Sequence, residues 1–204
     1  VATWAEAAAE SARRVSGHRG AAWWAEVTAE HAARSGDVSG RGRLLAAAIG
    51  DHVAAGDGPA ALALADELAD LGRSAGSGFL LAQAALARTE VFEPNQDVEA
   101  PPLLREALDH PDLAGDRAVR GDLLAGLAIT LGIPSVDGVP RDGGAARAAM
   151  AELADLAADG DARLRGQVAA CSLGVLSGPL HHRDRLRWRQ EYETLLPAGP
   201  NVLA

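Results

Sequence analysis

The chain has 204 residues and a formal net charge of −9 at pH 7, and all 19 of its basic residues are arginines. Nucleic-acid binding depends on cations that neutralise phosphates, so this charge argues against nucleic-acid contact and against attraction to an anionic membrane surface. Hydrophobic residues make up 48% of the chain but aromatic residues only 3%, so the apolar mass is Ala, Leu and Val. This composition predicts an all-α protein.

The apolar segments and the single cysteine bear on the cellular setting. No run of 18 apolar residues and no signal peptide is present, so the sequence predicts no membrane span. Cys171 lies in the run VAACSLGVL and is expected to be a buried, inert thiol in a cytoplasmic protein. The chain begins at Val1 without Met and ends on LLPAGPNVLA, so we expect it to be a piece of a longer protein.

Clusters of Gly, Pro and Asp divide the chain into segments of about 8 to 18 residues. Most segments have helical spacing of apolar residues, as Leu64, Leu68 and Leu71 show at i, i+4 and i+7. We expect about ten helices that are joined by short loops and paired as antiparallel hairpins.

The pentapeptide ELADL occurs at 67–71 and again at 152–156. The segments before the two copies share a glycine, an apolar residue and a second glycine, and the segments after them share leucine, glutamine and alanine. The matched pairs are Gly50/Gly126, Val53/Ile129, Gly56/Gly132, Leu80/Leu164, Gln83/Gln167, Ala85/Ala169 and Leu104/Leu186. This register predicts one domain over 1–204, with a leading hairpin at 1–42 and duplicated modules at 43–118 and 119–197.

The repeated small residues suggest how each hairpin packs. Gly50 and Gly126 are expected to let the second helix approach closely, because they lack a side chain, and Ala61 is expected to face that groove. Gly56 and Gly132 are expected to end their helices with a positive φ. Because one hairpin cannot bury its apolar face alone, neighbouring hairpins are predicted to stack.

The stretch GRLLAAAIGDHVAAGDGPAALALADELADLG at 42–72 resembles a tetratricopeptide repeat. Gly50, Val53, Gly56 and Ala61 fall near the family's small, aromatic, turn-glycine and small positions, whereas Ala46 stands where the family has Trp. The resemblance implies a right-handed superhelix of stacked hairpins.

More narrowly, 42–72 and the preceding WAEAAAESARRVSGHRGAAWWAEVTAEHAARSGD are similar to the tetratricopeptide-like region of large actinobacterial regulators. These are the MalT-like or large LuxR-family regulators and their AfsR/SARP relatives. The resemblance implies a non-enzymatic arm that binds a small-molecule inducer or a protein and signals to a P-loop ATPase. No nucleotide-binding or DNA-reading residue is carried over, because those motifs are not in this chain.

The absence of common catalytic motifs also indicates a non-enzymatic protein. The sequence has no phosphate-binding loop, HExxH, CxxC or G-x-S-x-G motif, so we expect no enzymatic activity and no cofactor. His181 and His182 are not expected to chelate a metal, because adjacent helical residues point about 100° apart. The alternatives are a self-assembly module that dimerises a regulator through its end helices or a stand-alone tetratricopeptide-like adaptor. A helical enzyme domain is less favoured.

Six residues are candidates for contact with a partner because they are aromatic or basic: Trp23, Trp24, Phe92, Arg185, Trp188 and Arg189. Core packing is favoured for both Trp23 and Trp24, and an exposed indole that anchors a partner or a homodimer is the alternative. Phe92 lies in a long loop, which is either part of a binding face or an ordinary insertion.

The run RDRLRWRQEYE at 183–193 allows two interpretations. It is either a patch that binds phosphate or nucleic acid, or an amphipathic end helix with Arg–Glu pairs on its outer face. The second interpretation is favoured, and it expects four side chains to be partly buried: Leu186, Trp188, Tyr192 and Leu195.

Overall fold

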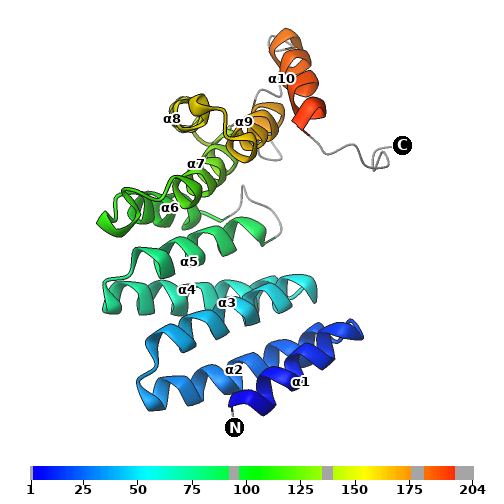
Figure 1. Cartoon of the computed structure of the whole chain (residues 1–204), viewed down its shortest axis with the longest axis vertical. Coiled ribbons are helices and arrows are strands. Elements are labelled where there is room, and N and C mark those ends of the chain that lie inside the picture. Colours follow the sequence, from blue (N-terminus) through cyan, green and yellow to red (C-terminus); the bar gives the residue numbers. More distant parts are fainter. Residues whose placement is uncertain (1, 92–96, 135–139, 176–181, 196–204) are drawn as a thin grey trace. The chain divides into compact units, whose positions relative to one another are not determined.

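The computed structural model describes residues 2–91, 97–134, 140–175 and 182–195. This part of the chain contains ten α-helices, which confirms the all-helical prediction (Figure 1). Their bounds are α1 Ala2–Arg14, α2 His18–Ser35, α3 Val38–Ala54, α4 Gly58–Ala75, α5 Gly78–Glu90, α6 Ala100–Leu108, α7 Arg117–Gly132, α8 Gly143–Leu156, α9 Ala162–Val175 and α10 His182–Leu195, with 3-10 turns η1 Pro111–Leu113 and η2 Ala157–Asp159. None of the described helices is long and apolar enough to cross a membrane.

The chain divides into two compact units, Val1–Leu113 and Ala114–Ala204. In the first unit each helix from α1 to α6 packs on the next, and α3 also contacts α5 (Figure 1). In the second unit α7, α8 and α9 pack on one another, and α10 packs on α9. The contacts between alternate helices show that hairpins stack within each unit. The right-handed superhelix stays a prediction.

Regular turns set the lengths of the helices in the first unit. Gly36, Gly56 and Gly76 follow α2, α3 and α4 at intervals of 20 positions, and all three have a positive φ, of 73°, 74° and 61°. The next residue then caps the following helix, as Asp37 does by accepting a hydrogen bond from the backbone N–H of Gly40 at 2.8 Å. The glycine ends one helix and the polar residue begins the next. Backbone C=O groups at the end of the first helix and N–H groups at the start of the second therefore find hydrogen-bond partners within a few residues.

Equivalent contacts show that α3, α4 and α5 correspond to α7, α8 and α9. The capping residues Asp37 of α3 and Asp116 of α7 are 79 positions apart, and Asp116 accepts from the N–H of Val119 at 3.0 Å. In α3 a Cβ added at Gly42 would collide with Leu80 of α5, and in α7 a Cβ added at Gly121 would collide with Leu164 of α9. The matched pair Leu80/Leu164 therefore occupies the same place in both units.

The two ELADL copies occupy equivalent places in α4 and α8. Glu67 accepts a hydrogen bond from Arg41 of α3 at 2.8 Å, and Glu152 accepts one from Arg120 of α7 at 2.7 Å. The leucine that follows each glutamate, Leu68 or Leu153, is fully buried. Such partly exposed ion pairs contribute only about 0–1 kcal/mol to the free energy of unfolding. The glutamate of the motif therefore adds little stability, and its main effect is on how the two helices align.

The predicted register for the first helix of each module is wrong. The capping residues and the glycine–leucine contacts give an offset of 79 positions, not the 76 that pairs Gly50 with Gly126. Gly50 is exposed and a Cβ there would meet nothing within 4 Å, whereas Gly126 is buried. Gly50 therefore does not serve the close approach of α4.

The other predicted small residues give mixed results. Gly56 has the expected positive φ, and Ala61 is fully buried as expected. Gly132 does not end α7 with a positive φ, because it is the last residue of the helix itself. A Cβ at Gly132 would lie 3.0 Å from the Cβ of Ala146 in α8, so this glycine permits the close approach that we expected at Gly126.

The correspondence does not extend to the last helix of each unit. Leu104 of α6 is fully buried, whereas its proposed counterpart in α10, Leu186, is 46% exposed. α6 therefore completes the core of the first unit, and α10 packs on its own unit in a different way.

A pair of glycine substitutions tests this account of the helix packing. Gly50→Ala should raise the free energy of unfolding by about 0.5–1 kcal/mol, because alanine restricts the unfolded chain and meets no neighbour. Gly72→Ala should lower it by about 1–3 kcal/mol, because the new Cβ would lie 2.9 Å from the backbone nitrogen of Leu81. Urea unfolding followed by circular dichroism measures both, and a stabilised Gly72→Ala variant would contradict the packing of α4 on α5.

Candidate functional site

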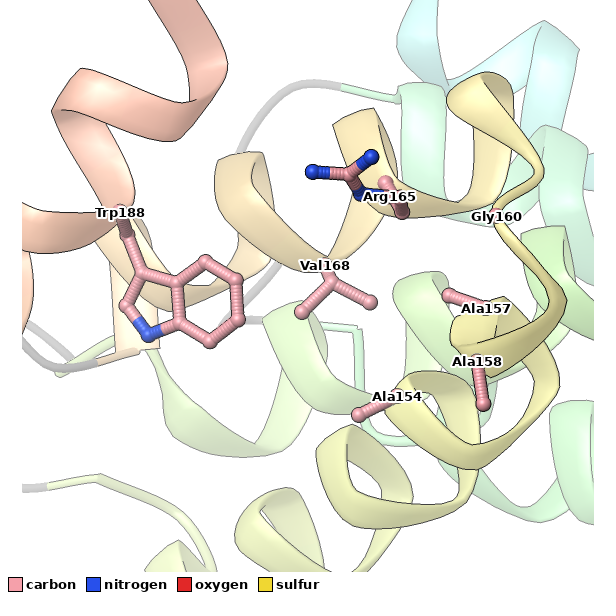
Figure 2. Close-up of a pocket in the computed structure, with 7 residues that line it drawn as sticks. All are labelled: Ala154, Ala157, Ala158, Gly160, Arg165, Val168 and Trp188. Atoms are coloured by element: carbon pink, nitrogen blue, oxygen red, sulfur yellow. The ribbon is translucent and has the colours of Figure 1, made fainter.

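The second unit contains a hollow of about 300 Å³ bounded by α8, η2, α9 and α10 (Figure 2). The chain continues from α8 into η2 and then turns at Gly160, whose φ is 87°. The side chains along this path are small, so they leave space in front of α9. The lining residues are Ala154, Ala157, Ala158, Gly160, Arg165, Val168 and Trp188. We call this space the Trp188 hollow.

Trp188 is the residue through which α10 contributes to the hollow. Figure 2 shows its indole pointing from α10 towards Val168 of α9. The indole is half-buried, and the guanidinium carbon of Arg187 lies 4.9 Å from the ring centroid. A cation over an indole face at this distance contributes about 0.5–1 kcal/mol at an exposed site. The indole is therefore held in place and still presents apolar surface to the hollow.

The side chains that line the hollow are apolar except for that of Arg165. Arg165 and Val168 project from α9 at the same hollow, and the α8–η2 side supplies only alanines and a glycine (Figure 2). A concave apolar space with one convergent charged group is the usual form of a small-molecule site. This arrangement suits a ligand with an aromatic or aliphatic body and an anionic group.

The favoured interpretation of α10 as an amphipathic end helix is correct in part. Trp188 and Tyr192 are half-buried, and Arg189 donates to Glu193 at 2.8 Å, as expected for an outer Arg–Glu pair. Leu186 is 46% exposed, contrary to expectation, and the side chain of Leu195 lies outside the described part of the structure. Arg185 is half-buried, and within the described residues its Nε is covered and has no hydrogen-bond partner. The predicted residues Arg185 and Arg189 do not line the hollow, whereas Trp188 does.

The first unit contains a second, polar cavity of about 230 Å³ between α1, α2 and α3. Its charged or polar lining residues are Glu10, Arg13, Thr28 and Arg43, and its apolar ones are Ala5, Ala9, Ala25 and Leu44. We call it the α1–α3 cavity. Sequence reasoning found none of these residues, because they come from three helices and have no shared motif.

A buried carboxylate holds Arg13, one of the residues that line the α1–α3 cavity. Asp51 of α3 is only 4% exposed and accepts three hydrogen bonds from Arg13 of α1, two from Nε at 3.0 Å and one from Nη2 at 2.7 Å. These bonds raise the pKa of Arg13. A bidentate arginine–carboxylate pair restricts the guanidinium to one plane. Arg13 is therefore a positioned cation at the edge of the cavity.

The remaining candidates from the sequence lie elsewhere. Trp23 is 55% exposed and Trp24 is half-buried, so the expectation that both indoles pack in the core is wrong for Trp23. Their rings meet edge to face at 4.5 Å between centroids. Another indole, that of Trp4 in α1, was not among the six candidates and is 83% exposed. Phe92 and His181 lie outside the described residues, and His182 is exposed.

The most deeply buried arginine is part of the scaffold. Arg88 of α5 is 6% exposed and donates to Asp97 at 2.7 and 2.9 Å and also to Asp66 of α4. Burial acts to raise the pKa of Asp97, but the hydrogen bonds from Arg88 and from the backbone outweigh it, so the pKa is lowered. The guanidinium of Arg88 is therefore neutralised by carboxylates, and we assign this cluster a structural role. Across the described ranges, no group of three or more His, Cys, Asp or Glu is placed to hold a metal ion.

Comparison with protein-family models, with curated proteins and with solved structures finds no match for this chain.

The thiol of Cys171 in α9 has the properties predicted from its apolar surroundings. It is 2% exposed, and burial raises its pKa to about 11. Because burial disfavours the thiolate, very little of the reactive form exists at neutral pH.

The accessibility of this thiol can be measured with Ellman's reagent. The native protein should react slowly at neutral pH, and its rate should keep rising with pH towards about 11 instead of levelling off near the ordinary thiol value of about 8.5. The same protein in urea serves as the control and should react at once. Fast modification of the native protein at neutral pH, with its helicity intact, would contradict the burial of Cys171.

Proposed function

We propose that the chain is a non-enzymatic binding and signal-coupling module in which the Trp188 hollow takes up a small apolar or aromatic molecule with an anionic group. The single observation that supports this proposal is the position of Trp188. The indole comes from α10 and closes an apolar space whose other walls come from α8, η2 and α9. Arg165 provides the cation for the anionic group of the ligand.

The same geometry suggests how binding is converted into a signal. A ligand in the hollow contacts α9 and the indole of α10 together, so it binds best to one placement of α10. A ligand that prefers one conformation increases the population of that conformation. α10 is thus the element whose position reports an occupied hollow.

An aromatic sulfonate tests the binding proposal directly. 8-Anilinonaphthalene-1-sulfonate combines an apolar aromatic body with an anion, and its fluorescence rises in an apolar site. Trp188→Ala should weaken its binding about tenfold, because the variant removes an aromatic wall of the hollow. Trp23→Ala is the matched control, since it removes an indole that lies in the other unit and lines neither cavity.

Both variants must unfold cooperatively in urea at a midpoint close to that of the unsubstituted protein, so that exposure of the core is not mistaken for binding. Equal affinity of the Trp188→Ala and Trp23→Ala variants for the sulfonate would show that the dye binds elsewhere. That result would overturn the assignment of the hollow.

We further propose that the module belongs to a cytoplasmic transcriptional regulator of the MalT-like, large LuxR-family or AfsR/SARP kind. The stacked hairpins of the first unit and the segment at 42–72 support this proposal, together with a binding hollow that suits an inducer. In such a regulator the module would pass the binding event to an ATPase and would not touch nucleic acid itself.

The coding sequence around the chain tests the regulator proposal. A P-loop ATPase before Val1 and a helix-turn-helix after Ala204 are the expected result. A start codon directly before Val1 and a stop codon directly after Ala204 would instead indicate a free-standing helical-repeat adaptor, and the regulator proposal would fail.

A further inference from the structure

We propose that the α1–α3 cavity of the first unit binds a free α-amino acid with a small apolar side chain. This site is separate from the Trp188 hollow, and the inference does not depend on the function proposed for that hollow. It rests on three features of the cavity: its paired charges, its positioned arginine and its size.

The charges in the cavity favour a ligand that carries both signs. Glu10 and Arg13 lie on the same helix, with Oε2 of the glutamate 3.7 Å from Nη1 of the arginine. An anion there would be repelled by Glu10 and a cation by Arg13 and Arg43. The carboxylate and the ammonium of an α-amino acid are bonded to the same carbon, so they can face Arg13 and Glu10 at the same time.

The hydrogen bonds between Arg13 and Asp51 do not use the Nη1 nitrogen of the guanidinium. Asp51 occupies the Nε and Nη2 side of the guanidinium, and Nη1 is the nitrogen nearest Glu10. A guanidinium has five N–H donors, so a ligand carboxylate can bind at the Nη1 side without breaking the pair with Asp51. Arg43 of α3 lines the same cavity and provides a second cation for that carboxylate.

Thr28 of α2 completes the polar surface. Its hydroxyl donates a hydrogen bond to the backbone carbonyl of Trp24 at 2.7 Å. Because the proton is used in that bond, the oxygen keeps lone pairs that can accept a hydrogen bond from an ammonium group. Thr28 and Glu10 therefore provide the hydrogen-bond acceptors of the site, and Arg13 and Arg43 provide its cations.

The apolar part of the cavity limits the size and polarity of the ligand's side chain. The apolar lining consists of three alanines and Leu44, and the volume is about 230 Å³. This is below the range of about 300–1,000 Å³ that is usual for drug-sized ligands. A small branched aliphatic side chain such as that of valine suits such a space.

Calorimetric titration of the full chain with three related compounds tests the need for both charges. L-Valine carries both groups, 3-methylbutanoate lacks the ammonium group, and 2-methylpropylamine lacks the carboxylate. L-Valine should bind, and each analogue should bind about tenfold more weakly or not at all, because it can make only one of the two charge contacts. The proposal is overturned if L-valine gives no heat of binding, or if either analogue binds as tightly as L-valine.

Variants locate the binding within the cavity. Glu10→Gln and Arg43→Gln should each weaken L-valine binding about tenfold while the hydrophobic lining stays the same. The matched controls are Glu30→Gln and Arg34→Gln, which change exposed charges of α2 that do not line the cavity. Urea midpoints show whether each variant is folded. Folded Glu10→Gln and Arg43→Gln variants that bind L-valine like the controls would place the site elsewhere and overturn the proposal.

Discussion

In each unit the packing depends on a leucine that lies against a glycine on the next-but-one helix. Leu80 of α5 meets Gly42 of α3, and Leu164 of α9 meets Gly121 of α7. A Cβ at either glycine would collide with a terminal methyl carbon of the leucine, so the missing side chain lets the alternate helices pack this closely. The intervening helix, α4 or α8, must then fit beside both of its neighbours. Its buried alanine, Ala61 or Ala146, satisfies that requirement.

The two units differ in how this shared core is completed, and the candidate site results from that difference. α6 inserts the fully buried Leu104 into the first unit. α10 instead exposes Leu186 and directs Trp188 towards α9. Because α8 continues into η2 with small side chains, the indole does not fill the space that it faces. Next to the duplicated helices, the last helix therefore completes the core in the first unit and borders a ligand-sized hollow in the second.

The arginines of this lysine-free chain differ in role according to the carboxylates that they pair with. Arg41 and Arg120 align neighbouring helices, and Arg88 is buried against two aspartates, so all three belong to the scaffold. Arg13 is also paired, with Asp51 at Nε and Nη2 and with Glu10 nearest Nη1, and it lines a cavity. A planar guanidinium can serve two partners at once, which an ammonium group does less well.

The sequence by itself determined the features that depend on nearby residues. Glycine and aspartate pairs mark the turns, because a positive φ and a capping oxygen act within a few positions, and apolar spacing identifies the helices between them. The 20-residue interval of Gly36, Gly56 and Gly76 can be seen in the sequence, although we recognised it only from their positive φ in the structure. The apolar surroundings of Cys171 were enough to predict its burial.

Only the tertiary structure decided which residues meet across helices. Gly50 and Gly126 look equivalent in the sequence, yet one is exposed and the other buried, because a shift of three positions turns a residue to a different place on the helix. Arg13 and Asp51 are 38 positions apart, and their pairing depends on how α1 lies along α3. The Trp188 hollow likewise depends on three helices and a 3-10 turn. No local pattern encodes such a site, because its shape is the space that packed helices leave unfilled.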